Sequence, residues 1–140
     1  MNLDRGTKIY TAVLGGILLL GLLAWLLTLD SRVGEINAML QQDQEISAYP
    51  YTFRALEIKG ATAVISTPRS NNMPAVRFLG IIKPGLSNKS EQDPRMIAAQ
   101  KELATIQSKI RKRVLKREDI DKIQWRIDKE WFARKGIWLE

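Results

Sequence analysis

Residues 12–29 read AVLGGILLLGLLAWLLTL and contain no charged side chain. With residues 9–11 included, the uncharged run is 21 residues long and extends from Ile9 to Leu29. At about 1.5 Å of rise per residue, a helix of this length spans the roughly 30 Å hydrocarbon core of a bilayer. We therefore predict a transmembrane helix at residues 9–29, preceded by a short tail at residues 1–8.

A cleaved signal peptide is the main alternative for this stretch. The run is longer than the apolar region of about 7 to 15 residues in signal peptides, and no small-x-small cleavage motif follows it. Arg5 and Lys8 precede the run, whereas Arg32 is the one basic side chain at residues 31–53. The length of the run and the missing motif predict an uncleaved anchor. Because basic residues favour the cytoplasmic side, its N-terminal tail is predicted to be cytoplasmic. The rest of the chain would lie outside, in a bacterial inner membrane protein on the periplasmic side.

The predicted span carries no ionisable side chain, so it offers no proton or ion pathway by itself. Two pairs of small residues at a spacing of four, Ala12 with Gly16 and Ala24 with Thr28, allow close approach of another helix. The same pairs are compatible with a helix that faces only lipid. Both readings stay open at this point.

Residues 30–48 are predicted to form a juxtamembrane helical stalk. Apolar residues recur near helical spacing at Val33, Ile36, Leu40 and Ile46, and a break is expected around Gly34. The stripe either packs on the protein's own domain or forms an assembly interface. Tyr49-Pro50 ends the stalk, because proline disfavours helical backbone in the residue before it.

Residues 49–140 are predicted to form one small extramembrane domain that begins with strands. Residues 51–58 and 61–67 are rich in β-branched and aromatic side chains and flank Lys59-Gly60, a pattern typical of a β-hairpin. A polar loop follows at residues 68–74. The apolar run at residues 75–82 is expected to be the central, most buried strand.

Two helices are predicted after a second polar loop at residues 86–92. Asp93-Pro94 is a helix start signal, and apolar residues recur at three and four positions through residues 94–115. The second helix would occupy residues 118–135, with acidic side chains in its first turn (Glu118, Asp119, Asp121) and Gly136 as its C-terminal cap. Residues 137–139 would form a short strand or the apolar contact that closes the cap. Three tryptophans are expected to be structural: Trp125, Trp131 and Trp138.

The expected fold class is therefore α+β. A three- to four-stranded antiparallel sheet would be covered by a C-terminal αα-hairpin, because strands precede helices in the chain. One domain of this size buries a modest core.

The chain is basic, with 22 Lys and Arg against 15 Asp and Glu. Six of the basic residues lie close together between positions 109 and 117: Lys109, Arg111, Lys112, Arg113, Lys116 and Arg117. They fit either a solvated helix end, where cations offset the helix dipole, or a patch for polyanions or a partner. The patch lacks the interleaved aromatics that bind bases, so nucleic acid is not an expected partner.

The sequence contains neither histidine nor cysteine. This composition excludes zinc sites of the usual ligands and nucleophiles activated by imidazole, and no Gly-rich phosphate loop is present. We expect no enzymatic activity, no cofactor and no small-molecule substrate. The leading hypothesis is a bitopic accessory subunit of a membrane complex that acts through protein contacts. A membrane-tethered binder of anionic lipid or polyanion comes second, and an enzyme that uses carboxylates comes third.

Overall fold

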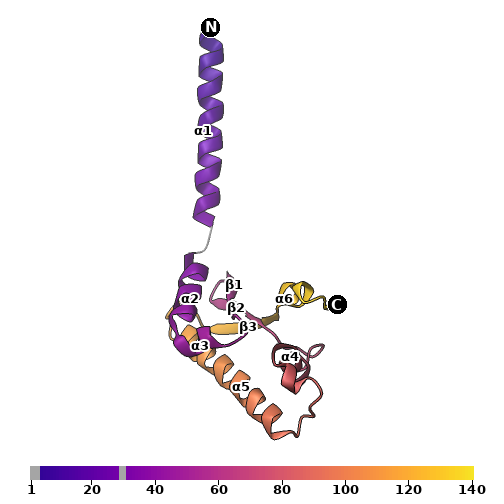
Figure 1. Ribbon diagram of the computed structural model, residues 1–140. Coiled ribbons are helices and arrows are strands. Elements are labelled where there is room, and N and C mark those ends of the chain that lie inside the picture. Colours follow the sequence, from indigo (N-terminus) through magenta and orange to yellow (C-terminus); the bar gives the residue numbers. More distant parts are fainter. Residues whose placement is uncertain (1–3, 29–30) are drawn as a thin grey trace. The chain divides into compact units, whose positions relative to one another are not determined.

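The computed structural model describes residues 4–28 and 31–140. Leu29 and Asp30, where the predicted span meets the predicted stalk, lie outside the described residues. The elements follow one another along the chain as shown in Figure 1: α1 (Arg5–Thr28), α2 (Ser31–Gln42), α3 (Gln44–Ala48), β1 (Ala55–Lys59), β2 (Thr62–Thr67), α4 (Ala75–Ile82), the 3-10 helix η1 (Pro84–Leu86), α5 (Pro94–Leu115), β3 (Lys122–Ile127) and α6 (Lys129–Arg134).

The chain divides into two compact units, Met1–Ser31 and Arg32–Glu140. In the first unit, α1 includes a stretch that is long and apolar enough to cross a membrane, Arg5–Leu26, and none of its most apolar part is buried. Its large side chains are exposed, among them Leu18 and Leu20 at 67% each. Helices on the surface of water-soluble proteins carry charged side chains, whereas α1 has none after Lys8.

The second unit is built on a three-stranded sheet of order β1-β2-β3. β1 and β2 form the predicted antiparallel hairpin, and Gly60 in its turn has φ 62°, which glycine adopts without a Cβ clash. A bulge at Leu56 shifts the register between Ala55 and Glu57. Central β2 is the most buried strand, with Ala63, Val64, Ile65 and Ser66 all fully buried.

The predicted central strand at residues 75–82 is wrong, because this segment is α4. A short apolar run fits a buried strand or a buried helix equally well, and periodicity alone cannot separate them. Helical backbone turns Phe78 and Leu79 into the core on adjacent positions of one face. Gly80 then allows close packing, since a Cβ on it would lie 3.1 Å from the Cα of Ser87.

The predicted second helix at residues 118–135 is also wrong in its first part. Residues 122–127 form β3, and the helix in this region is the short α6. The apolar residues of this segment fit two patterns. Ile120, Ile123 and Ile127 have helical spacing, whereas Ile123, Trp125 and Ile127 alternate as in a strand. Six consecutive pairs with β2 decide in favour of the strand. Glu118 and Asp119 consequently lie in a turn and Asp121 directly precedes β3, so none of them is in the first turn of a helix.

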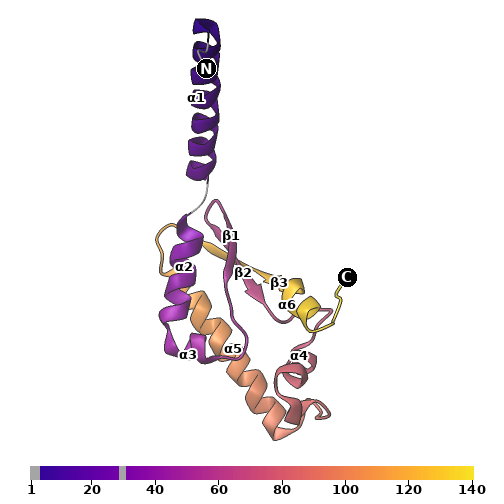
Figure 2. The same cartoon turned by 45° about the horizontal axis from the view of Figure 1, so that its top comes forward.

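β3 runs parallel to β2, so the sheet is mixed and not antiparallel. A parallel pair needs a crossover connection, and here α4, η1 and α5 supply it. α5 lies along one face of the sheet, as Figure 2 shows. The coarser α+β class is therefore correct, whereas the C-terminal αα-hairpin is not formed.

α5 matches its prediction. Asp93 accepts a hydrogen bond from the N–H of Arg95 at 2.9 Å, and Pro94 occupies the first turn. The apolar positions of the predicted face are buried in the core: Met96, Ala99, Leu103, Ile106, Ile110 and Val114.

The residues of the predicted stalk pack on the domain that follows them. Ile36, Leu40 and Ile46 are buried and belong to the same core as α5 and the sheet. The helix continues through Gly34 and breaks instead at Asp43, between α2 and α3. α3 ends at Ala48, before Tyr49-Pro50, as proline requires.

Gly136 caps α6 as predicted, with φ 80°. Its N–H donates to the carbonyl of Ala133, and the N–H of Ile137 donates to that of Phe132, both at 2.9 Å, which is the Schellman pattern. Ile137 and Leu139 pack against the core, and residues 137–139 form no strand. Trp125 and Trp131 also pack on the core, but Trp138 is 82% exposed, contrary to the structural role predicted for it.

Candidate functional site

The basic segment at the end of α5 divides into two groups of side chains. Lys109 and Arg113 lie four residues apart and therefore share one flank of α5, and Arg117 follows just beyond the end of the helix. This flank faces acidic residues of α2 and α3. Lys109 Nζ lies 3.0 Å from a carboxylate oxygen of Glu45, and an Arg117 nitrogen lies 2.9 Å from one of Glu35.

Asp43 is the centre of these contacts. Its side chain is 2% exposed, and its two oxygens lie 3.2 Å from Lys109 Nζ and 2.6 Å from Arg113 Nε. It also caps α3 by accepting from the N–H groups of Glu45 and Ile46. Burial raises the pKa of Asp43, but the Ile46 N–H and the two cations outweigh it and leave the pKa below its ordinary value. Lys109 and Arg113 thus hold α5 against α3, and Arg117 holds the segment after α5 to Glu35 of α2.

The other three basic residues, Arg111, Lys112 and Lys116, form no ion pair within the described chain, and all three are exposed. Arg117 has a second carboxylate partner in Asp119 at 3.0 Å, and its pKa is raised by Asp119 and Glu35. The sequence places six cations together. In the structure three of these six cations form ion pairs with other parts of the domain, and the other three remain available to a ligand.

A second charged cluster joins the two ends of the domain and was not predicted. Asp128 accepts hydrogen bonds from the Tyr51 hydroxyl and from Arg54 Nη1, both at 2.8 Å. It also caps α6 by accepting from the N–H of Trp131 at 3.2 Å. Burial raises the pKa of Asp128, but the hydrogen bonds from Arg54, Tyr51 and Trp131 hold it below the ordinary range.

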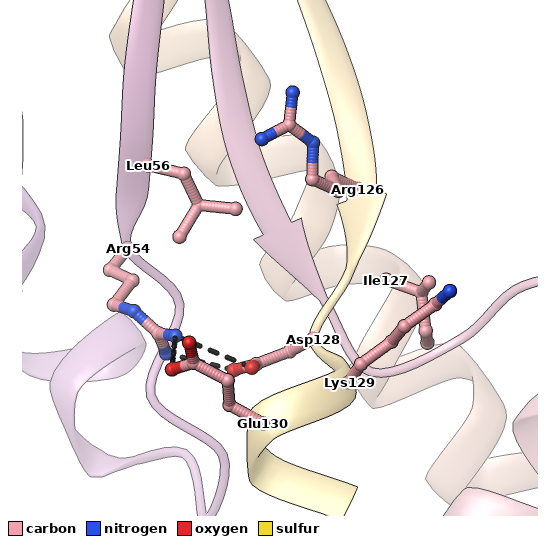
Figure 3. Close-up of a pocket in the computed structure, with 7 residues that line it drawn as sticks. All are labelled: Arg54, Leu56, Arg126, Ile127, Asp128, Lys129 and Glu130. Carbon is pink, nitrogen blue, oxygen red and sulfur yellow. Dashed lines mark hydrogen bonds and ion pairs between the residues drawn. The ribbon is translucent and has the colours of Figure 1, made fainter. Parts of the chain in front are cut away.

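Figure 3 shows Arg54 and Asp128 at one end of a cavity on the sheet face opposite α5. The cavity has a volume of about 610 Å³, and Leu56 and Arg126 project into it from β1 and β3. Arg126 is paired with Glu57 at 3.1 Å. Both oxygens of the Asp128 carboxylate already accept hydrogen bonds. Asp128 therefore connects the segment before β1 to the end of β3 and to α6, and it is not a free base.

A sequence signal existed for both carboxylates, because aspartate is a preferred N-cap. Asp43 precedes the short helix α3 and Asp128 precedes α6. The signal was missed because the expected helices ran through both positions. Among residues 4–28 and 31–140, no group of three or more His, Cys, Asp or Glu could hold a metal ion.

The small residues of α1 keep the spacing seen in the sequence. Ala12 and Gly16 lie one turn apart on an exposed face, and nothing lies within 4 Å of a Cβ added at Gly16. Ala24 is exposed as well, while the side chain of Thr28 lies outside the described part of the chain.

Comparison of the chain with protein-family models, with curated protein sequences and with solved structures finds no match.

Proposed function

We propose that the protein is a single-pass membrane protein whose domain acts through contacts with other proteins of a membrane complex. The observation that carries the proposal is α1, whose Arg5–Leu26 stretch is long and apolar enough to span a bilayer and has an exposed apolar surface. Leaving such a surface in water costs about 25 cal/mol per Å² of apolar area, so lipid is its natural environment.

In this proposal residues 1–8 form a cytoplasmic tail, and the domain lies outside, on the periplasmic side of a bacterial inner membrane. The support is the distribution of Arg5 and Lys8 against Arg32. A reporter that is active on one side of the membrane, fused after Glu140, tests the orientation. Activity of a cytoplasmic reporter would reverse it.

In this proposal the domain docks on other subunits through its surface. The buried charged clusters join its own elements, and its apolar core is closed around the sheet and α5. We expect full-length protein extracted from its native membrane in a mild detergent to migrate in a complex larger than the monomer. A monomer under these conditions would contradict the proposal.

A matched variant separates the anchor from the domain in this experiment. Residues 9–29 are replaced by an unrelated apolar helix of the same length. If the complex persists, the domain makes the contacts. If the complex is lost while the protein stays in the membrane, the contacts lie in the span, and Ala12 and Gly16 become the residues to substitute next.

Binding of anionic lipid or polyanion is the second candidate, and one observation favours it: Lys112 and Lys116 are exposed and unpaired within the described chain. Each cation near an anionic surface adds about 1 kcal/mol. Reversal of these two residues to Glu is a cleaner test than reversal of the whole segment, because Arg113 and Arg117 hold the fold. Unchanged binding to anionic vesicles would exclude this candidate.

A further inference from the structure

The two edges of the sheet differ in whether their outward backbone groups have hydrogen-bond partners. At the β1 edge, the Asn37 side chain of α2 makes both hydrogen bonds that a neighbouring strand would make. Its Oδ1 accepts from the N–H of Ala55 at 2.7 Å, and its Nδ2 donates to the Ala55 carbonyl at 3.2 Å. An edge strand with unpaired backbone groups is a template for another strand. α2 therefore occupies the β1 edge at Ala55.

The β3 edge is open. Directly after β3, the N–H of Asp128 donates to the carbonyl of Thr67 at 2.9 Å. At the start of the strand, the N–H groups of Asp121 and Lys122 both donate to the carbonyl of Ala61, at 2.8 and 3.3 Å. Backbone groups alternate sides along a strand, so the even-numbered residues of β3 face β2. The odd-numbered residues point their N–H and C=O groups outwards, where no described strand pairs with them: Ile123, Trp125 and Ile127.

A groove lies beside this edge on the α5 side of the sheet. It has a volume of about 320 Å³ and runs between Trp125 of β3 and a stripe of α5 that contains Ala104, Ser108 and Arg111. Lys109 and Arg113, which contact α3, lie on the other flank of the helix. The stripe beside the open edge thus starts with two small side chains, which leave room for an added strand above the helix.

The charged side chains of the groove are both positive, and hydrogen bonds hold one of them in place. Gln107 is buried, donates to Thr67 Oγ1 and accepts from Arg69 Nε, both at 2.9 Å. This chain of hydrogen bonds fixes the Arg69 guanidinium at the wall of the groove. Arg111 lines the same groove without an ion pair in the described chain, and no acidic residue lines it.

From this arrangement we propose that the β3 edge binds an extended acidic segment of another protein, which joins the sheet as a fourth strand. The backbone of Ile123 and Trp125 pairs with the segment, and its carboxylates contact Arg69 and Arg111. A second copy of this chain is a poorer occupant, because it would bring the same positive groove against itself. The inference rests on the proposed function, since it names the chemistry of the partner that the domain contacts.

The test uses the full chain in detergent or nanodiscs and a short capped peptide that alternates Val and Glu. Two control peptides alternate Val with Lys, or carry Pro in place of every Val so that strand pairing is blocked. We expect binding of the first peptide only. Failure of the Val-Glu peptide to bind, or equal binding of the Val-Lys peptide, would overturn the proposal.

The matched variants are R111E and K112E. They reverse adjacent exposed cations on the same helix, but only Arg111 lines the groove. We expect R111E to weaken peptide binding about tenfold or more, equivalent to about 1.4 kcal/mol, and K112E to leave it nearly unchanged. Equal losses in both variants would show attraction to net charge alone and contradict the site.

Amide hydrogen exchange reads the strand pairing directly. In the bound state the Ile123 and Trp125 amides should become protected, while the Gln124 and Arg126 amides, which already face β2, should change little. Protection of Trp125 without peptide, in a particle of dimer mass, would show a second copy at the edge and overturn the proposal.

The two proposals can fail separately. A native complex that is as stable in R111E as in the wild type supports contacts through protein but places them elsewhere, which overturns this inference alone. A monomeric full chain that binds the Val-Glu peptide at Trp125 would instead contradict the complex as proposed while retaining the edge as a site.

Discussion

Two buried aspartates show how a single residue can join elements that are distant in the chain. Asp43 holds α5 to α3, and Asp128 holds the segment before β1 to α6. Both also cap a helix with the same carboxylate. Burying a charge is costly unless it is paired and hydrogen bonded. Both oxygens of Asp128 accept hydrogen bonds, whereas in Asp43 only Oδ1 does and Oδ2 is held by its ion pair with Arg113.

Tyr49 and Tyr51 form a natural pair for testing the Asp128 cluster. The Tyr51 hydroxyl donates to Asp128 at 2.8 Å, whereas the buried Tyr49 hydroxyl has no hydrogen-bond partner within the described residues. We expect Y51F to lower the free energy of unfolding by about 1.5 kcal/mol, the usual cost of a lost bond to a charged group. Y49F should be neutral or stabilising. Chemical denaturation measures both, and a larger loss in Y49F would contradict this assignment.

Acid should weaken the domain through these carboxylates. The folded state holds the pKa of Asp128 below its ordinary value of 3.8, because the bonds from Arg54, Tyr51 and Trp131 outweigh burial. The stabilisation is therefore complete above about pH 5 and is lost as the pH falls through the lower pKa of the folded state.

The variant D128N isolates this contribution. It should lower stability near neutral pH by about 2 to 3 kcal/mol, because Arg54 loses its charged partner, and it should flatten the decline in acid. Denaturation curves recorded at several pH values provide the measurement. An acid decline as steep as in the wild type would assign the effect to other groups, with Asp43 the first to examine.

Two glycines distinguish an open face of a helix from a packed one at the level of elements. Nothing lies within 4 Å of a Cβ built on Gly34 in α2, whereas one built on Gly80 in α4 meets the Ser87 backbone at 3.1 Å. G34A should raise stability by about 0.5 to 1 kcal/mol, since alanine favours helix over glycine. G80A should lower it, because η1 must move. Thermal unfolding compares the two, and a stabilising G80A would mean that α4 and η1 pack loosely.

The elements that sequence could identify are those with a local signal. The Lys59-Gly60 turn fixed the hairpin, Asp93-Pro94 fixed the start of α5, and Gly136 fixed the end of α6. The two wrong assignments, at α4 and β3, fall where the local pattern fits two structures. At β3 the free edge of β2 decides, because it pairs with Lys122 to Ile127, and this is a tertiary property.

The candidate sites follow the same division. The basic segment was visible in the sequence because it is continuous, but its separation into paired and free cations depends on α2 and α3. Arg69, Gln107 and Trp125 come from three distant segments, and only the parallel crossover brings them to one groove. No sequence pattern could have indicated that site.

At the scale of the whole molecule, the apolar surface is concentrated in one unit. The large exposed apolar side chains of the described chain lie on α1, apart from Ile97 and Trp138. Arg32–Glu140 forms its own compact unit with its own core. The need for lipid or detergent should therefore reside in the first unit.

Deletion of residues 1–30 tests this separation. We expect the remaining chain to be soluble without detergent, monomeric and cooperatively unfolded by heat, as is usual for single domains of this size. Deletion of residues 1–42 is the control, because it also removes Ile36, Leu40 and Asn37 and so opens both the core and the β1 edge. That shorter chain should aggregate or unfold. If the first truncation also unfolded, the domain would depend on residues of the first unit. If both truncations stayed folded, α2 would not be the part of the domain that its burial indicates.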